Sequence, residues 1–186
     1  MKKALVFIAT ALIGVAAMAQ PKFAHVNLTE LIQLMPEADD ARAKLEASSL
    51  EAQETFQAMV EEYQAKYTTY SQKASTWTTA IRESKEKELM EIQQRIQDFD
   101  QSIQKELSEM QQMLMAPIQK KAMDTINALA KEGGYIYVFE ESSLLYIDKA
   151  QSTDLTPAAR KALNIPDGRT LETLSQELQA KAQMAE

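Results

Sequence analysis

The chain of 186 residues has no cysteine, one histidine and more acids than bases, with a formal net charge of −7. The lack of cysteine excludes disulfides, thiol redox chemistry and thiolate metal ligands. The acidic balance weighs against nucleic acid as a partner, because nucleic-acid binding needs a concentrated basic surface.

Residues 1–19 have the pattern of a signal peptide. Lys2 and Lys3 precede an uncharged apolar stretch over residues 4–17, and an A-x-A cleavage site ends at Ala19. An uncleaved membrane anchor is the alternative, but the stretch is short for a span of roughly 20 residues. We expect cleavage after Ala19 and a soluble protein in the periplasm, with association with the outer membrane as a further expectation. The mature chain has 18 bases and 27 acids, a net charge of −9.

Residues 20–35 are predicted to form a first strand and a short helix. Residues 22–28 place Ala24, Val26 and Leu28 on one face of a strand, with a period of two. Residues 29–34 can form a helical turn, for which Thr29 is a suitable N-cap.

Residues 36–132 are predicted to form a long helical hairpin. Between Pro36 and Gly133 the chain has no glycine and one proline, Pro117, which we expect to kink or locally unwind a helix. Apolar residues recur about every 3.6 residues over 38–81 and again over 89–129. Serine and threonine crowd the segment between these two runs, so the reversal is expected at residues 71–82.

The period changes from 3.6 to two after Gly133 and Gly134, which stop the second helix. Residues 135–139 and 144–147 are rich in β-formers, and they predict a β-hairpin. A short helix over 158–163 completes the body formed by residues 133–163. The C-terminal tail, residues 164–186, is expected to contain a last helix over 171–181.

The predicted class is therefore mainly α with a small β body. A long antiparallel helical hairpin, a coiled-coil arm, projects from a body that several copies build together. Three strands from one chain make a marginal sheet with open edges, so an oligomerisation body shared between chains is the simplest solution.

No residue pattern predicts catalysis, a cofactor or a metal site. His25, the single histidine, lies on the first predicted strand, where packing is the plain interpretation. Paired carboxylates along the chain are typical of solvated helices and turns rather than of acid–base catalysis. The chain is not expected to be an enzyme.

Aromatic and methionine side chains along the hairpin are the candidate contact residues. Flexible thioethers and amphipathic rings suit surfaces that accept many partners, although filling of the hairpin core is the alternative. These candidates are Tyr67, Tyr70, Trp77, Met90, Met113 and Met115.

Two segments resemble the Skp/OmpH family of periplasmic chaperones. The opening KFAHVNLTELIQLMPE is similar to the start of that family, and APIQKKAMDTINALAKEGGYIYVFEESSLLYID is similar to its helix-to-strand junction. The resemblance covers residues 22 to about 163, and it leaves the tail from Asn164 outside the family core.

The resemblance implies a homotrimer with a β-barrel-like body and three arms around a cavity. Such proteins hold unfolded outer-membrane proteins without ATP. Body residues implied in this way are Phe23, Val26, Ile136, Val138, Leu145 and Ile147. The charge of −9 departs from the basic arms typical of the family, so it weighs against lipopolysaccharide as a partner.

Two other functions remain open from the sequence. One is a structural or adaptor coiled-coil protein of the envelope with one dedicated partner. The other is a peripheral membrane protein, although neither predicted helix has the basic polar face that favours anionic lipid.

Overall fold

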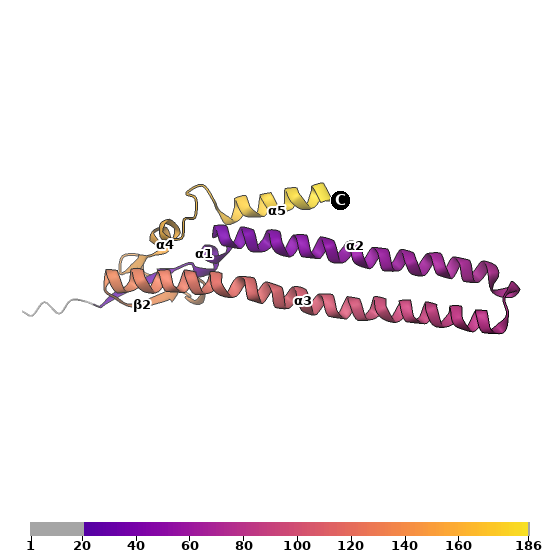
Figure 1. The fold of residues 1–186 in the computed structure, drawn as a ribbon. Coiled ribbons are helices and arrows are strands. Elements are labelled where there is room, and N and C mark those ends of the chain that lie inside the picture. The colour runs from indigo at the N-terminus through magenta and orange to yellow at the C-terminus, as the bar shows by residue number, and fades with distance from the viewer. Residues whose placement is uncertain (1–20, 186) are drawn as a thin grey trace, which may run out of the picture.

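The computed structural model describes residues 21–185, and the predicted signal peptide and its cleavage after Ala19 lie outside this range. The molecule is elongated, with a small body at one end and a helical hairpin that extends far from it (Figure 1). Within the described range, no helix combines the length and the apolar character that a membrane crossing requires.

In chain order, the elements belong first to the body, then to the hairpin, and then to the body and the tail. They are β1 (Lys22–Val26), α1 (Leu28–Leu34), α2 (Pro36–Lys73), the 3₁₀ turn η1 (Ala74–Thr76), α3 (Thr79–Gly133), β2 (Tyr135–Glu140), the 3₁₀ turn η2 (Glu141–Ser143), β3 (Ser152–Asp154), α4 (Thr156–Ala162) and α5 (Leu171–Ala185). The mainly helical class with a small sheet is confirmed. We call the α2–α3 hairpin the arm.

Local signals set the ends of the two arm helices. Met35 is extended, with ψ of 139°, and Pro36 starts α2 at a position where its missing N–H costs nothing. The Thr78 hydroxyl accepts a hydrogen bond from the Ile81 N–H and caps α3. Gly134, with φ of 68°, ends α3 in the left-handed region, which glycine adopts without steric cost.

Helix α3 is unbroken across Pro117, so the local unwinding that we expected there does not occur. A proline ring removes one helical N–H and crowds the carbonyl four residues earlier, which is that of Met113. Met113 is exposed, and solvent can therefore satisfy the freed carbonyl.

The sheet has the order β2–β1–β3, and both pairings are parallel. The expected β-hairpin within residues 133–163 is therefore wrong. After β2 the chain forms η2, and residues 144–147 pair with no strand of the described chain. The chain then returns to place β3 on the other side of β1. The sheet is open, so one chain does not form the expected barrel-like body.

The hydrophobic core lies where the root of the arm meets the body. Helix α3 contributes to both, because its last turns pack on α1 and α4 while its first turns form the arm. The buried residues of this cluster are Ala24, Val26, Leu31, Leu34, Met35, Ala38, Ala41, Ile118, Ala122, Ile126, Leu155, Ala159, Leu163, Ile165 and Leu174.

Candidate interaction surfaces

Burial falls off sharply along the arm. In α2 the buried residues are Ala38 and Ala41 at the root, and in α3 Ile92 is the one buried residue outside the root. Two helices without a third layer bury one narrow stripe each, and larger apolar side chains remain at the surface. On the arm these exposed residues are Leu50, Phe56, Tyr67, Ile81, Met90, Met113 and Met123.

The predicted contact residues divide into two groups along the arm. Tyr67, Met90 and Met113 are 53%, 61% and 69% exposed. Tyr70 and Trp77 are half-buried because their rings pack edge to face, with centroids 6.0 Å apart. Met115 is half-buried against the core at the root.

The tip of the arm carries a small aromatic cluster. Tyr63 stacks on Tyr67 with centroids 6.1 Å apart, one turn before the Tyr70–Trp77 pair. Beside Trp77 lies a hollow of about 280 Å³, lined also by Ala65, Lys66, Thr69, Lys85, Glu88 and Leu89. The tip therefore has a concave surface that is lined by both apolar and charged side chains.

Ion pairs join α2 to α3 near the tip and at the root. Near the tip Lys66 contacts Glu88, and Arg95 Nη2 lies 3.1 Å from Glu62 Oε2. At the root Lys121 contacts Glu37. These pairs cannot be predicted from periodicity, because they depend on which turns of the two helices lie opposite one another.

Two carboxyl groups in these pairs titrate below their ordinary range. Hydrogen bonds from Lys66 and Lys85 lower the pKa of Glu88 to about 2. A hydrogen bond from Lys121 lowers the pKa of Glu37. In both cases the ammonium group stabilises the charged form of the carboxylate.

The body presents an apolar edge on β2, which is one of the two edge strands of the sheet within the described chain. Ile136, Tyr137 and Phe139 are 55%, 59% and 41% exposed, and Phe23 stacks on Tyr137 with centroids 6.3 Å apart. Sequence reasoning missed Tyr137 and Phe139, although the β-rich run that contains them was visible. We call the exposed side chains of β2 the β2 face.

The predicted body residues do not all lie on this face. Val26 is buried in the core, and Val138 is half-buried and packs against it. Phe23 and Ile147 are half-buried. Leu145 is fully exposed and its neighbour Tyr146 is 81% exposed, so both side chains make little contact within their own chain.

Polar groups in the body have structural roles. His25 is buried in the central strand, where its Nδ1 lies 2.8 Å from the Ser152 hydroxyl of β3. Within residues 21–185, no group of three or more histidine, aspartate or glutamate side chains is arranged to hold a metal ion.

This geometry defines a class of fold in which a long two-helix arm extends from a body with a small open sheet. The chain belongs to the OmpH-like family of outer membrane proteins, whose family model matches residues 22–163. The chaperone protein Skp of Yersinia enterocolitica is 26% identical over 150 residues, covering 78% of this chain and 88% of that protein. Members of this family are chaperones and not enzymes, and membership supports a chaperone role.

The fold has a counterpart among solved structures. A crystal structure of an OmpH-like protein from Caulobacter crescentus, described as an outer membrane chaperone, aligns with a TM-score of 0.70 at 14% identity. The alignment covers 78% of this chain and 85% of that one. At this identity the likeness concerns the fold alone. The family model ends at residue 163, so the tail with α5 lies outside it.

Glu88 makes the stability of the tip dependent on pH. Because its pKa is lowered from 4.5 to about 2, its contribution is present above pH 4.5 and is lost as the pH falls through 2. The single tryptophan, Trp77, lies beside this cluster and reports on it. We expect the melting temperature, followed by Trp77 fluorescence, to fall as the pH is lowered from 4.5 to 2. At pH 7 we expect Glu88→Gln to lower the melting temperature.

The effect of Glu88→Gln should be modest, roughly a few degrees, because exposed ion pairs contribute little and are screened by salt. Glu91→Gln is the matched control, since Glu91 pairs only within α3, with Lys87 at 3.7 Å. An unchanged pH response in Glu88→Gln would show that the inter-helix pair does not stabilise the tip.

Proposed function

We propose that this chain is an ATP-independent holdase chaperone of the periplasm that binds unfolded outer-membrane proteins between its arms. The observation that supports this best is the surface of the arm, where large apolar side chains stay exposed along helices that lack a third layer. Family membership points in the same direction.

Client binding would use many weak contacts rather than one site. Burying a methionine or phenylalanine side chain contributes about 1.5–3 kcal/mol, so a few contacts spread along the arm hold a chain while each one exchanges readily. Tyr67, Met90 and Met113 are the exposed candidates. With a net charge of −9 on the mature chain, apolar and hydrogen-bonding contacts carry the interaction, and lipopolysaccharide is not proposed as a partner.

A homotrimer would supply the cavity that this mechanism needs. The β2 face supports self-association, because an edge strand with exposed aromatic side chains is unfavourable in water. Leu145 and Tyr146 follow β2 in the chain and have little contact inside their own chain. Pairing between copies would cover the edge strand and both side chains.

One observation favours a second function, an adaptor with a single dedicated partner. At the tip, the Tyr70–Trp77 pair and the adjoining hollow form a defined surface, which suits one shaped partner better than many unfolded ones.

The first test measures holdase activity. A urea-unfolded β-barrel membrane protein, diluted into buffer without ATP, should stay soluble at a near-equal ratio to the trimer, with light scattering as the readout. The double variant Met90→Ser, Met113→Ser should weaken this protection severalfold and leave the melting temperature unchanged, because both side chains project into solvent.

The control for this test is Gln93→Ser, Gln112→Ser, which changes two exposed residues of the same helix without removing apolar area. Aggregation that proceeds unchanged with the native protein present would contradict the holdase function.

The second test concerns assembly. Leu145→Ser with Tyr146→Ser should lower the mass of the intact complex towards that of one chain, measured by native mass spectrometry. Helix content should stay the same, since neither side chain supports the fold of its own chain. Lys149→Ser, an exposed change in the same loop, is the control. A native complex that is dimeric would remove the proposed cavity.

The third test separates the two functions. Trp77→Ser with Tyr70→Ser removes the aromatic pair at the tip. A holdase should lose only part of its protection of several different clients, because contacts along the rest of the arm remain. Complete loss of one pairwise complex, detected by pull-down from a periplasmic extract, would instead favour the adaptor function.

A further inference from the structure

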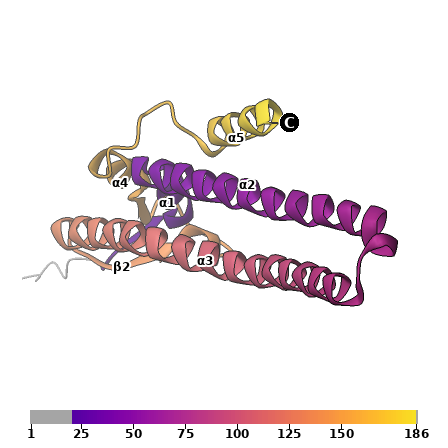
Figure 2. The ribbon, with the colours of Figure 1, turned by 45° about the vertical axis from the view of Figure 1, so that its right-hand side comes forward.

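Helix α5 lies beside the root of the arm, outside the part of the chain that the family model matches. It runs along the first turns of α2 (Figure 2), and Leu174 enters the common core with 5% of its surface exposed. Two surface hollows lie between α5 and the neighbouring helices. One is lined by α5 and Gln33 of α1, and the other by α5 and residues of α2 from Asp39 to Glu46.

The linker that leads to α5 is fixed to the body. Asn164 has φ of 57°, a left-handed conformation that asparagine tolerates, and it turns the chain out of α4. Ile165 is then buried with 4% of its surface exposed. Arg160 Nη1 lies 2.6 Å from Glu30 Oε1 of α1, and Nη2 donates to the Pro166 carbonyl at 3.0 Å.

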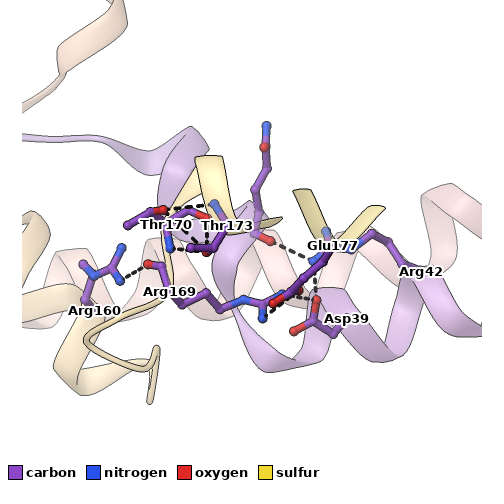
Figure 3. A network of polar contacts seen from close by, with 8 residues as sticks. Asp39, Arg42, Arg160, Arg169, Thr170, Thr173 and Glu177 are labelled. Atoms are coloured by element: carbon purple, nitrogen blue, oxygen red, sulfur yellow. Dashed lines mark hydrogen bonds and ion pairs between the residues drawn. The ribbon is translucent and has the colours of Figure 1, made fainter. Parts of the chain in front are cut away.

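The start of α5 is capped by a reciprocal pair of threonines (Figure 3). The Thr170 hydroxyl accepts from the Thr173 N–H at 3.1 Å, and the Thr173 hydroxyl accepts from the Thr170 N–H at 2.9 Å. This arrangement satisfies N–H groups at the helix start that would otherwise lack partners. Helix α5 therefore begins at a defined place next to the arm.

Arg169 connects this tail to the arm. Its side chain is 17% exposed, and Figure 3 shows it extended toward Asp39 of α2 and Glu177 of α5. Arg169 Nη2 lies 2.6 Å from Asp39 Oδ1, and Nη1 lies 3.5 Å from Glu177 Oε2. Asp39 also accepts from Arg42, whose Nη2 reaches back to the Gln33 carbonyl at 3.0 Å. The network thus crosses the break between α1 and α2.

The two weak points of the arm lie at the same level as this network. One is the extended residue Met35, where α1 ends and α2 begins. The other is Pro117, which deprives α3 of one hydrogen bond. Lys121 pairs with Glu37 in an antiparallel hairpin. One turn before Lys121 is Pro117, and it lies at the level of Ala41, one turn after Glu37. Pro117 therefore lies at the level of the stretch of α2 that α5 flanks.

We propose that α5 is a splint that stiffens the root of the arm and fixes its direction relative to the body. It attaches to α1 and α2 on both sides of the Met35 break through Arg169, Leu174 and the linker. Loss of these contacts leaves the arm free to swing about Met35 and Pro117. This role concerns arm motion alone, and it holds whether the arm binds many clients or one partner.

Distance measurements between two spin labels test the splint. The chain has no cysteine, so labels can be placed at Glu54→Cys on α2 and Ala162→Cys on α4, with the labelled chain diluted into unlabelled protein. We expect a narrow distance distribution in the native background, and a clearly broader one with Arg169→Gln or with Leu174→Ala. The matched control is Lys120→Gln, which removes an ion pair of 2.6 Å to Asp124 within α3.

Hydrogen exchange supplies an independent readout. The backbone amides of residues 35–41 and 114–120, other than the prolines at 36 and 117, should exchange roughly tenfold faster in Arg169→Gln, the change expected when one charge-assisted hydrogen bond is lost. Amides of β1 should be unaffected, which separates a loosened root from general unfolding. Should either variant lose helical signal, the native chain at high salt serves instead, and it should show the same broadening. Unchanged distances and unchanged root exchange in both variants would overturn the proposal.

Discussion

The packing of α2 and α3 into one shared core at the root of the arm is the constraint on which the rest of the structure depends. Ala38 and Ala41 of α2 and Ala122 of α3 are almost completely buried there, and their small side chains let the two helices pack against one body. Because α3 runs without a break from the tip to β2, the same helix orients the arm and positions the sheet. A larger side chain at Ala122, which has no exposed surface, would overpack this contact.

Beyond the root the same two helices have nothing else to pack against. An amphipathic helix buries a stripe, and a pair of helices covers only part of each stripe, so apolar area remains in contact with water. Leu50 and Phe56 on α2 and Met113 on α3 are exposed for this reason. The exposed apolar area that makes the arm a poor globular domain is also the surface that the proposed function would use to bind other chains. The buried core is thus concentrated at the root, while exposed apolar side chains continue along the whole hairpin.

Local patterns predicted the helices, but not the pairing of the strands. The 3.6-residue period and the glycines that end α3 act within a few residues, so the sequence alone indicates them. The partner of a strand is set by distant residues instead. Residues 135–139 were recognised as β-forming, yet their partner is β1, more than a hundred residues earlier, and residues 144–147 pair with no strand of the described chain. Periodicity also could not separate Met115, which packs on the core, from exposed Met113.

The distribution of ion pairs indicates where along the arm a client, under the proposed function, would displace apolar contacts rather than ion pairs. Among residues 21–185, the pairs that join α2 to α3 are Lys121–Glu37 at the root, and Lys66–Glu88 and Arg95–Glu62 in the half nearer the tip. The stretch between them is held by half-buried apolar contacts alone, and Leu50 and Phe56 lie within it. Apolar contacts are non-directional, so a client side chain can replace them without leaving a charge unpaired. Under the proposed function, the middle of the arm would exchange contacts between α2 and α3 for contacts with a client, while the ion pairs at both ends keep the two helices in register. A root stiffened by α5 would keep that exchange from altering the direction of the whole arm.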